Sequence, residues 1–208
     1  MAQPDGYLAN GGGSPVLVLH AWWGLNDTIR KFCDRLGDAG FTAFALDLYH
    51  GEVTDQISEA EKLGGALDAR VDQARAEIND AVTFLKQQTG ADSIAVIGFS
   101  LGAFYALDLS ARLPDSIRSV VVFYGTGPAD FSKAKAAYLG HFAGDDPYEP
   151  PSNVAELEAD IKQAGRPVTF YTYPGTGHWF FEPDRADAYN EAAAALAWER
   201  TLAFLKGT

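Results

Sequence analysis

Short runs of apolar residues recur along the chain, and each is bounded by Gly, Pro or Asp. A continuous run such as Val16–Leu19 is typical of a strand that is buried on both faces, the usual situation in a parallel sheet. The pattern also predicts a short edge strand near Tyr7–Ala9. The longer strands that we expect are Pro15–His20, Phe41–Leu48, Ser93–Gly98, Ser119–Tyr124, Ala136–Phe142 and Pro167–Tyr173.

The segments between these runs have helical spacing. Apolar residues recur every three or four positions from Leu67 to Leu85, which predicts one helix with a single apolar face. Further helices are expected at about 27–38, 101–112, 152–164 and 185–205. The alternation of strand and helix predicts the α/β class, with a mostly parallel central sheet and helices on both faces.

The length favours one domain. A chain of 208 residues is sufficient for a single α/β domain and short for two. No internal repeat, low-complexity tract or linker interrupts the pattern, and Gly125–Lys135 is too short to form a lid domain. We therefore expect residues 1–208 to form one domain without a lid.

The charge balance excludes some classes of partner. Sixteen Lys and Arg residues stand against 28 Asp and Glu residues, for a formal net charge of −12. Such a surface repels nucleic-acid phosphates and anionic lipid, so neither nucleic acid nor a membrane is an expected partner. The start of the chain has no signal-peptide pattern, and Cys33 is the only cysteine, so we expect a cytoplasmic protein without a disulfide. Monomer and homodimer both stay open.

The clearest chemical motif is Gly98-Phe99-Ser100-Leu101-Gly102. It lies directly between a predicted strand and a predicted helix, where a serine on a sharp turn projects its hydroxyl above the edge of the sheet. The following helix supplies free N–H groups and a partial positive charge. The alternative is an incidental serine in a glycine-rich turn, because the pentapeptide alone is a weak signal.

Two later loops strengthen the catalytic interpretation. Asp145 and Asp146 follow one predicted strand and His178 follows the next, which places serine, acid and histidine at one sheet edge in the chain order of α/β-hydrolases. A histidine takes the proton of the serine hydroxyl, and a carboxylate holds its tautomer. The alternative for His178 is a surface residue without a role.

The other histidines have weaker claims. His20 ends a predicted strand and is a candidate for the pocket, whereas His50 is expected to be structural or to lie at the pocket rim. His141 lies within a strand and is expected to be packed. No His-Glu-x-x-His or similar spacing occurs, so we do not expect a catalytic metal.

Nearly the whole chain resembles the dienelactone hydrolase family, which implies an α/β-hydrolase fold and an enzyme that needs no cofactor. The stretches that carry the resemblance are Pro15–Asn26, Asp47–Gly51, Gly98–Ala103, His141–Pro150, Tyr173–Phe180 and the final segment from Tyr189 to Phe204.

The resemblance also implies a role for each matching residue. Ser100 becomes the nucleophile and His178 the base, and of the two aspartates it favours Asp146 as the acid. The backbone N–H groups of Trp22 and Leu101 become the donors of the oxyanion hole.

Three positions depart from the family's name-giving members. Those members have a cysteine nucleophile where Ser100 stands, a glutamate where Ala21 stands and a substrate-binding arginine where Glu182 stands. We expect Glu182 to lie near the catalytic histidine and to disfavour substrates that carry a carboxylate, unless Arg185 compensates. A second substrate-binding arginine has no certain match; Arg70 and Arg75 are candidates.

Aromatic residues on the same loops predict a mostly apolar substrate pocket. Trp22 and Phe180 belong to this set, although core packing is the alternative for each member. The pocket residues that we expect are His20, Trp23, Phe99, Tyr124, Tyr148 and Trp179.

Together these features predict a serine hydrolase that cleaves small ester or lactone substrates through an acyl-enzyme on Ser100. A non-catalytic binding protein on the same fold is one alternative, although an intact Ser100, Asp146 and His178 set argues against lost turnover. Acyl transfer to an acceptor other than water is another, because it shares the first half-reaction.

Overall fold

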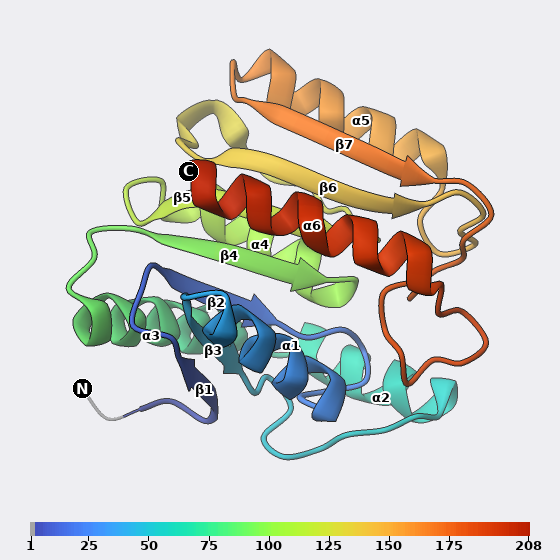
Figure 1. Ribbon diagram of the computed structural model, residues 1–208, viewed down its shortest axis with the longest axis horizontal. Helices are drawn as coiled ribbons and strands as arrows, with labels where there is room; N and C mark the ends of the chain where they lie inside the picture. The colour runs from blue at the N-terminus through green and yellow to red at the C-terminus, as the bar shows by residue number, and fades with distance from the viewer. Residues whose placement is uncertain (1–2) are drawn as a thin grey trace.

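A computed structural model describes residues 3–208. A seven-stranded sheet forms the centre of the molecule (Figure 1). The strand order is β1-β3-β2-β4-β5-β6-β7, and all neighbours are parallel except β1, which pairs antiparallel with β3. The strands are β1 (Gly6–Asn10), β2 (Pro15–Leu19), β3 (Thr42–Leu46), β4 (Ile94–Phe99), β5 (Ile117–Phe123), β6 (Ala137–Ala143) and β7 (Val168–Tyr173).

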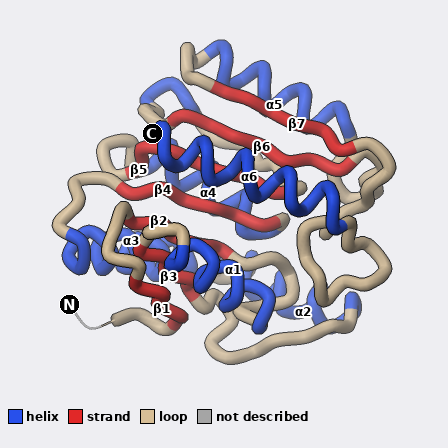
Figure 2. The backbone as a smooth tube through the Cα atoms, in the orientation of Figure 1, coloured by secondary structure: helices blue, strands red, loops and turns tan. Residues whose placement is uncertain are grey.

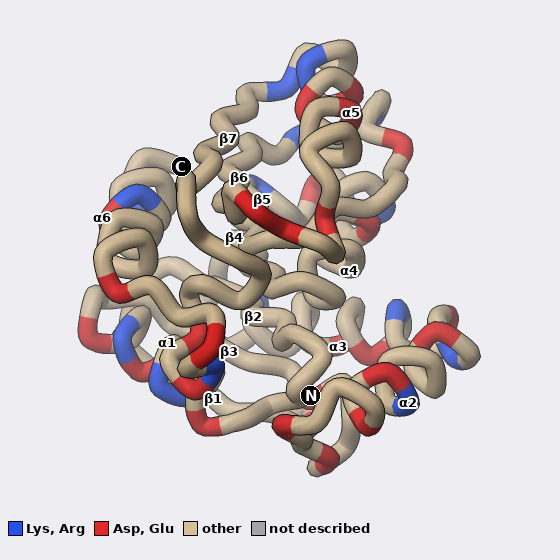
Figure 3. Tube along the Cα trace, turned by 90° about the vertical axis from the view of Figure 1, so that its right-hand side faces the viewer, with Lys and Arg blue, Asp and Glu red and all other residues tan. Residues whose placement is uncertain are grey.

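Helices cover both faces of this sheet (Figures 2 and 3). Helices α1 and α6 pack on one face, and α3, α4 and α5 pack on the other, which gives three layers. No helix in the described part of the chain is long and apolar enough to cross a membrane. The helices are α1 (Asp27–Asp38), α2 (Ile57–Asp68), α3 (Val71–Thr89), α4 (Leu101–Arg112), α5 (Pro151–Gln163) and α6 (Glu191–Gly207).

The two helical layers explain the continuous apolar runs. In β2, Leu17 and Leu19 belong to the core on the α3–α5 side, while Val16 and Val18 belong to the core on the α1–α6 side. Successive strand residues point to opposite faces, so a strand covered on both sides needs apolar residues throughout. The predicted α/β class with a mostly parallel sheet is therefore confirmed.

The predicted helix from Leu67 to Leu85 is wrong in one respect, because the structure divides it. Leu67 belongs to the end of α2, and α3 begins only at Val71. The break lies at Arg70, whose φ of −124° and ψ of 33° are not helical. Leu67 and the apolar residues of α3 nevertheless pack into the same core. This is why apolar residues recur at helical spacing across the break.

Other predicted boundaries also move, and hydrogen bonds explain two of these differences. β3 ends at Leu46 rather than at residue 48, because the Asp47 carboxylate accepts the N–H groups of Tyr49 and Gly51 and turns the chain. α6 begins at Glu191 rather than at residue 185, because the Asn190 side chain accepts the N–H of Ala193 as an N-cap.

The parallel strands bring their carboxyl ends to the same edge of the sheet. Trp22 follows β2, Ser100 follows β4, Tyr124 follows β5, Asp146 follows β6 and His178 follows β7. In open α/β sheets this edge is where ligands bind. The residues that the sequence singles out for chemistry thus come from separate loops to one region.

Candidate active site

Ser100 lies on a strained turn between β4 and α4. Its φ is 48° and its ψ is −112°, a conformation that non-glycine residues rarely adopt. The flanking glycines make the turn possible: a Cβ on Gly98 would lie 2.3 Å from the Gly102 carbonyl oxygen, and one on Gly102 would lie 2.2 Å from the Leu19 carbonyl oxygen. The glycines are therefore required by close backbone packing.

Three side chains form a continuous hydrogen-bonded line at this turn. Ser100 Oγ lies 2.9 Å from His178 Nε2, and His178 Nδ1 lies 2.7 Å from Asp146 Oδ2. The side chains of His178 and Asp146 are 4% and 3% exposed. This is the geometry in which an imidazole accepts a serine proton while a carboxylate fixes its tautomer.

The structure distinguishes the two aspartates of this loop. Asp146 Oδ1 accepts the backbone N–H groups of Tyr148 and Glu149, at 2.9 and 3.0 Å, which leaves Oδ2 directed at His178. Asp145 has a more open position, and its backbone N–H donates to the Thr176 carbonyl oxygen. Asp146 is therefore the aspartate that is placed to orient the histidine.

The two residues expected to supply oxyanion donors lie at the same cleft as Ser100. Trp22 and Leu101 line the cleft, and Leu101 is the first residue of α4. Within residues 3–208, neither N–H donates to another backbone or side-chain acceptor. Free donors at a helix N-terminus are suited to stabilise a developing oxyanion.

The cleft beside Ser100 has a volume of about 230 Å³ and is walled largely by aromatic rings. The Tyr124 and Tyr148 rings lie 5.0 and 5.1 Å from the His178 ring, measured between centroids. Of the expected pocket residues, Tyr124, Tyr148 and Trp179 line the cleft. The full lining is Trp22, Ser100, Leu101, Phe104, Tyr124, Gly125, Thr126, Tyr148, Glu149, His178 and Trp179.

The expectation that His20, Trp23 and Phe99 line the pocket is wrong. His20 is fully buried, where Nδ1 donates to the Ala21 carbonyl oxygen at 2.7 Å and Nε2 accepts the Leu48 N–H. The Trp23 ring packs 5.0 Å from the Trp179 ring inside the core on the α1–α6 side. Phe99 points to that same face, because it alternates with its neighbours along β4.

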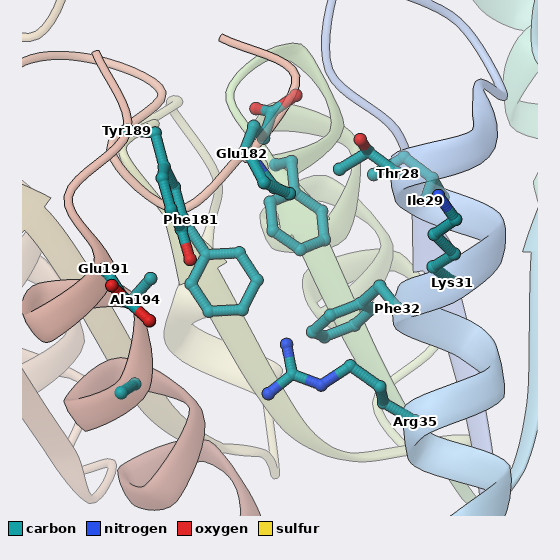
Figure 4. A pocket seen from close by; sticks show the side chains of 13 residues that line it. Thr28, Ile29, Lys31, Phe32, Arg35, Phe181, Glu182, Tyr189, Glu191 and Ala194 are labelled. Atoms are coloured by element: carbon teal, nitrogen blue, oxygen red, sulfur yellow. The ribbon is translucent and has the colours of Figure 1, made fainter. Parts of the chain in front are cut away.

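Phe99 instead lines a second cavity of about 330 Å³, which lies between α1 and α6 (Figure 4). Its walls include Phe32, Phe181 and Arg35. Although this cavity is larger than the cleft, it contains none of the residues hydrogen-bonded at Ser100, and it is not the catalytic pocket.

Glu182 also lies at this second cavity, which corrects the expectation that it faces the substrate. The residue is 1% exposed, and its Oε1 accepts the Tyr124 hydroxyl at 2.6 Å, from behind the cleft wall. Burial, with a smaller contribution from Asp184, raises the pKa of the Glu182 carboxyl to about 8, against the opposing effects of the Tyr124 hydrogen bond and Arg185. At neutral pH this carboxyl is therefore mostly uncharged.

We expect Glu182→Gln to stabilise the protein increasingly as the pH rises from 5 to 8. Unfolded Glu182 ionises near the ordinary glutamate pKa of 4.5, whereas the folded carboxyl holds its proton to about pH 8, so wild-type stability falls through this window. The amide keeps an acceptor for Tyr124. The gain approaches a maximum on the order of 4 kcal/mol.

Urea unfolding of both proteins at pH 5 and pH 8 measures this gain. Glu156→Gln, at an exposed position of α5, is the matched control and should show no such trend. A gain in stability for Glu182→Gln that is equal at both pH values would contradict a raised pKa of the Glu182 carboxyl.

The candidate arginines do not reach the cleft. Arg70 pairs with Glu77, and Arg75 pairs with Asp108. Arg185 stacks on the Trp23 ring at 4.0 Å and donates to the Asp55 carbonyl oxygen. None of these arginines can neutralise a substrate carboxylate beside His178. Arg185 therefore does not provide the positive charge that would compensate for Glu182 in binding such a substrate.

The remaining histidines lie outside the cleft. His141 is packed as expected, between the Tyr173 hydroxyl at 2.8 Å and the Thr201 hydroxyl at 3.0 Å, and burial lowers its pKa to about 3. His50 lies beside Asp5 and Glu77, away from the pocket rim. No group of three His, Cys, Asp or Glu side chains suited to a metal ion occurs within residues 3–208.

Sequence reasoning missed Glu149, the single Asp or Glu side chain that lines the cleft among the described residues. Its carboxylate accepts the Thr126 N–H at 2.7 Å and the Thr126 hydroxyl at 2.9 Å. Its place in the loop of Asp146, three residues further along the chain, was the available signal.

A serine on a strained strand–helix turn, with an acid and a histidine from later loops of a mostly parallel sheet, defines an α/β-hydrolase. The family model of the dienelactone hydrolase family matches residues 5–208. The chain belongs to the dienelactone hydrolase family, and it is a hydrolase of carboxylic ester bonds.

Individual relatives agree with this assignment. The protein named usf from Aquifex pyrophilus is 32% identical over 97% of this chain and 92% of its own length. A Bradyrhizobium protein provisionally named 2-oxo-3-(5-oxofuran-2-ylidene)propanoate lactonase is 33% identical over 92% of this chain and 82% of its own length. A solved Klebsiella pneumoniae structure, provisionally described as a dienelactone hydrolase, has a TM-score of 0.81 and 23% identity, and the match covers 99% of this chain and 90% of that one.

Proposed function

We propose that this protein is a serine hydrolase that cleaves small esters or lactones through an acyl-enzyme on Ser100. The observation that carries the proposal is the line from Ser100 Oγ through His178 to Asp146, with separations of 2.9 and 2.7 Å. Ser100 lies on a strained turn, beside two N–H groups without another acceptor. We also propose that the chain acts as one catalytic domain.

The reaction has two halves. Ser100 Oγ attacks the carbonyl carbon while His178 Nε2 takes the hydroxyl proton, and the N–H groups of Trp22 and Leu101 bind the resulting oxyanion. The tetrahedral intermediate collapses, the bond to the leaving oxygen breaks, and His178 gives its proton to that oxygen. Asp146 holds the Nδ1–H throughout and stabilises the transient imidazolium.

Water completes the cycle. It attacks the acyl carbonyl while His178 takes one of its protons, and the tetrahedral intermediate expels Ser100 Oγ, which regains the proton from Nε2. The products are a carboxylic acid and the alcohol released in the first half. For a lactone, the acyl group and the alcohol remain parts of one molecule throughout, so the product is a single hydroxy acid.

A stopped-flow experiment with p-nitrophenyl acetate tests the proposal. We expect a burst of about one equivalent of p-nitrophenolate per chain, followed by slower steady turnover, because acylation by an activated ester outpaces deacylation. A folded protein that releases no p-nitrophenolate would support a non-catalytic binding protein. A burst that is followed by steady turnover only when an alcohol acceptor is added would support acyl transfer.

A further inference from the structure

The Glu149 carboxylate is held rigidly in the wall of the catalytic cleft. Oε2 accepts the backbone N–H of Thr126 at 2.7 Å, and Oε1 accepts the Thr126 hydroxyl at 2.9 Å and the Asn153 amide at 3.1 Å. These donors span the start of α5 and the loop after β5, so rotation away from the cleft would break several bonds at once. A substrate in the cleft therefore meets a fixed negative charge.

Nothing in the cleft neutralises that charge. The lining contains no Lys or Arg side chain, and Glu149 forms no ion pair within residues 3–208. Its hydrogen-bond donors, two from Thr126 and one from Asn153, are all uncharged. A positively charged group on a ligand would therefore balance the carboxylate of Glu149.

Aromatic rings line the same cleft as this carboxylate. The Tyr148 ring lies 6.0 Å from the Trp22 ring and 5.0 Å from the Trp179 ring, and all three line the cleft with Glu149. Tyr148 is 45% exposed, so part of its ring is open to a ligand. Aromatic faces attract ammonium groups, most strongly where several rings surround the cation.

The net charge of the whole chain also favours cationic ligands over anionic ones. Its formal net charge of −12 raises the local concentration of cations and repels anions over distances of about a Debye length. That long-range field is not specific to the cleft, however, so an experiment must separate it from the effect of Glu149.

We propose that the cleft selects small esters that carry an ammonium group, which Glu149 and the rings of Trp22 and Tyr148 bind while Ser100 attacks the ester. This inference rests on the proposed hydrolase function and names its substrate class. It also predicts the order of preference, from cationic through uncharged to carboxylate-bearing substrates.

Acetylcholine, its uncharged isostere 3,3-dimethylbutyl acetate and 3-acetoxypropanoate form the test series. At low salt we expect kcat/KM for acetylcholine to exceed that for the isostere at least tenfold, and the anion to be slowest. Glu149→Gln should bring the first ratio close to one. Asp145→Asn is the matched control, because it removes one negative charge from the same loop at a position outside the cleft lining.

The variants separate the local charge from the general field. An equal loss of preference in Glu149→Gln and Asp145→Asn would assign the effect to net charge and overturn the inference. Equal rates for acetylcholine and its isostere in the unmodified protein would also overturn it, while leaving the hydrolase function intact.

A binding measurement keeps the two proposals distinguishable. Calorimetry of tetramethylammonium with Ser100→Ala should show binding that Glu149→Gln, introduced into the same background, weakens at least tenfold. Tetramethylammonium binding in a protein that hydrolyses none of the esters would support the ammonium site and contradict the proposed cleavage of small esters through Ser100. The absence of tetramethylammonium binding would overturn the ammonium site.

Discussion

Replacing Ser100 by alanine should lower kcat for p-nitrophenyl acetate by about 10⁴- to 10⁶-fold, because the hydroxyl that hydrogen-bonds to His178 Nε2 is lost. The residual rate would come from the free N–H groups and from binding. Steady-state kinetics measures the loss, and the burst phase should disappear with it.

The stability of this variant is a useful control. Ser100 adopts a φ of 48°, and alanine must keep the same unfavourable conformation, so the strain is unchanged. Unfolding in urea should therefore show a stability close to that of wild type. A variant that keeps a substantial fraction of wild-type kcat would show that Ser100 is not the nucleophile.

Asp146→Asn should lower kcat by about 10⁴-fold, while Asp145→Asn should change it less than tenfold. The amide introduced by Asp146→Asn can offer its NH₂ group to His178 Nδ1, which favours the tautomer whose Nε2 carries a proton. That Nε2 cannot accept the serine hydroxyl proton. The Asp145 side chain is exposed, by contrast, and it is Asp146 that holds His178 Nδ1.

The pair of variants is informative because both remove one charge from adjacent positions of one loop. Kinetics with p-nitrophenyl acetate at a fixed pH compares them directly. The opposite ranking, with Asp145→Asn the more damaging, would mean that the acid is assigned one residue out of place.

The grouping of Ser100, Asp146 and His178 at one place could be predicted from sequence, for physical reasons. Parallel strands end at one edge, so residues that directly follow β4, β6 and β7 must lie near one another whatever the details of the loops. For Ser100 and His178, this edge rule was combined with the Gly98-Phe99-Ser100-Leu101-Gly102 motif and the chain order of α/β-hydrolases. The choice of Asp146 over Asp145 depended on the family resemblance, and the structure supports it through the N–H groups that orient the carboxylate.

The position of Glu182 could not be predicted from its spacing to His178. Trp179 has a φ of 65°, and consecutive turns follow, in which the N–H groups of Phe180 and Glu182 donate to the Gly177 and Trp179 carbonyl oxygens. These turns fold the segment beneath Tyr124, so Glu182 is buried and leaves the cleft. Turn conformation of this kind depends on tertiary packing, which spacing does not encode.

Glu149 was missed for a related reason. A glutamate next to a proline in a polar loop is typical of an exposed residue, and the donors that fix it lie on Thr126 and Asn153, from different segments. The strand pattern predicts which loops meet at the cleft. It does not predict which side chains of those loops turn inward.

Covalent labelling tests the central claim most directly. A fluorophosphonate should react once per chain with release of fluoride, and peptide mass spectrometry should place the adduct on Ser100, since His178 and the free N–H groups activate that hydroxyl alone. His178→Ala should abolish the labelling while the protein stays folded. A folded wild-type protein that stays unlabelled, or an adduct on another residue, would contradict the account.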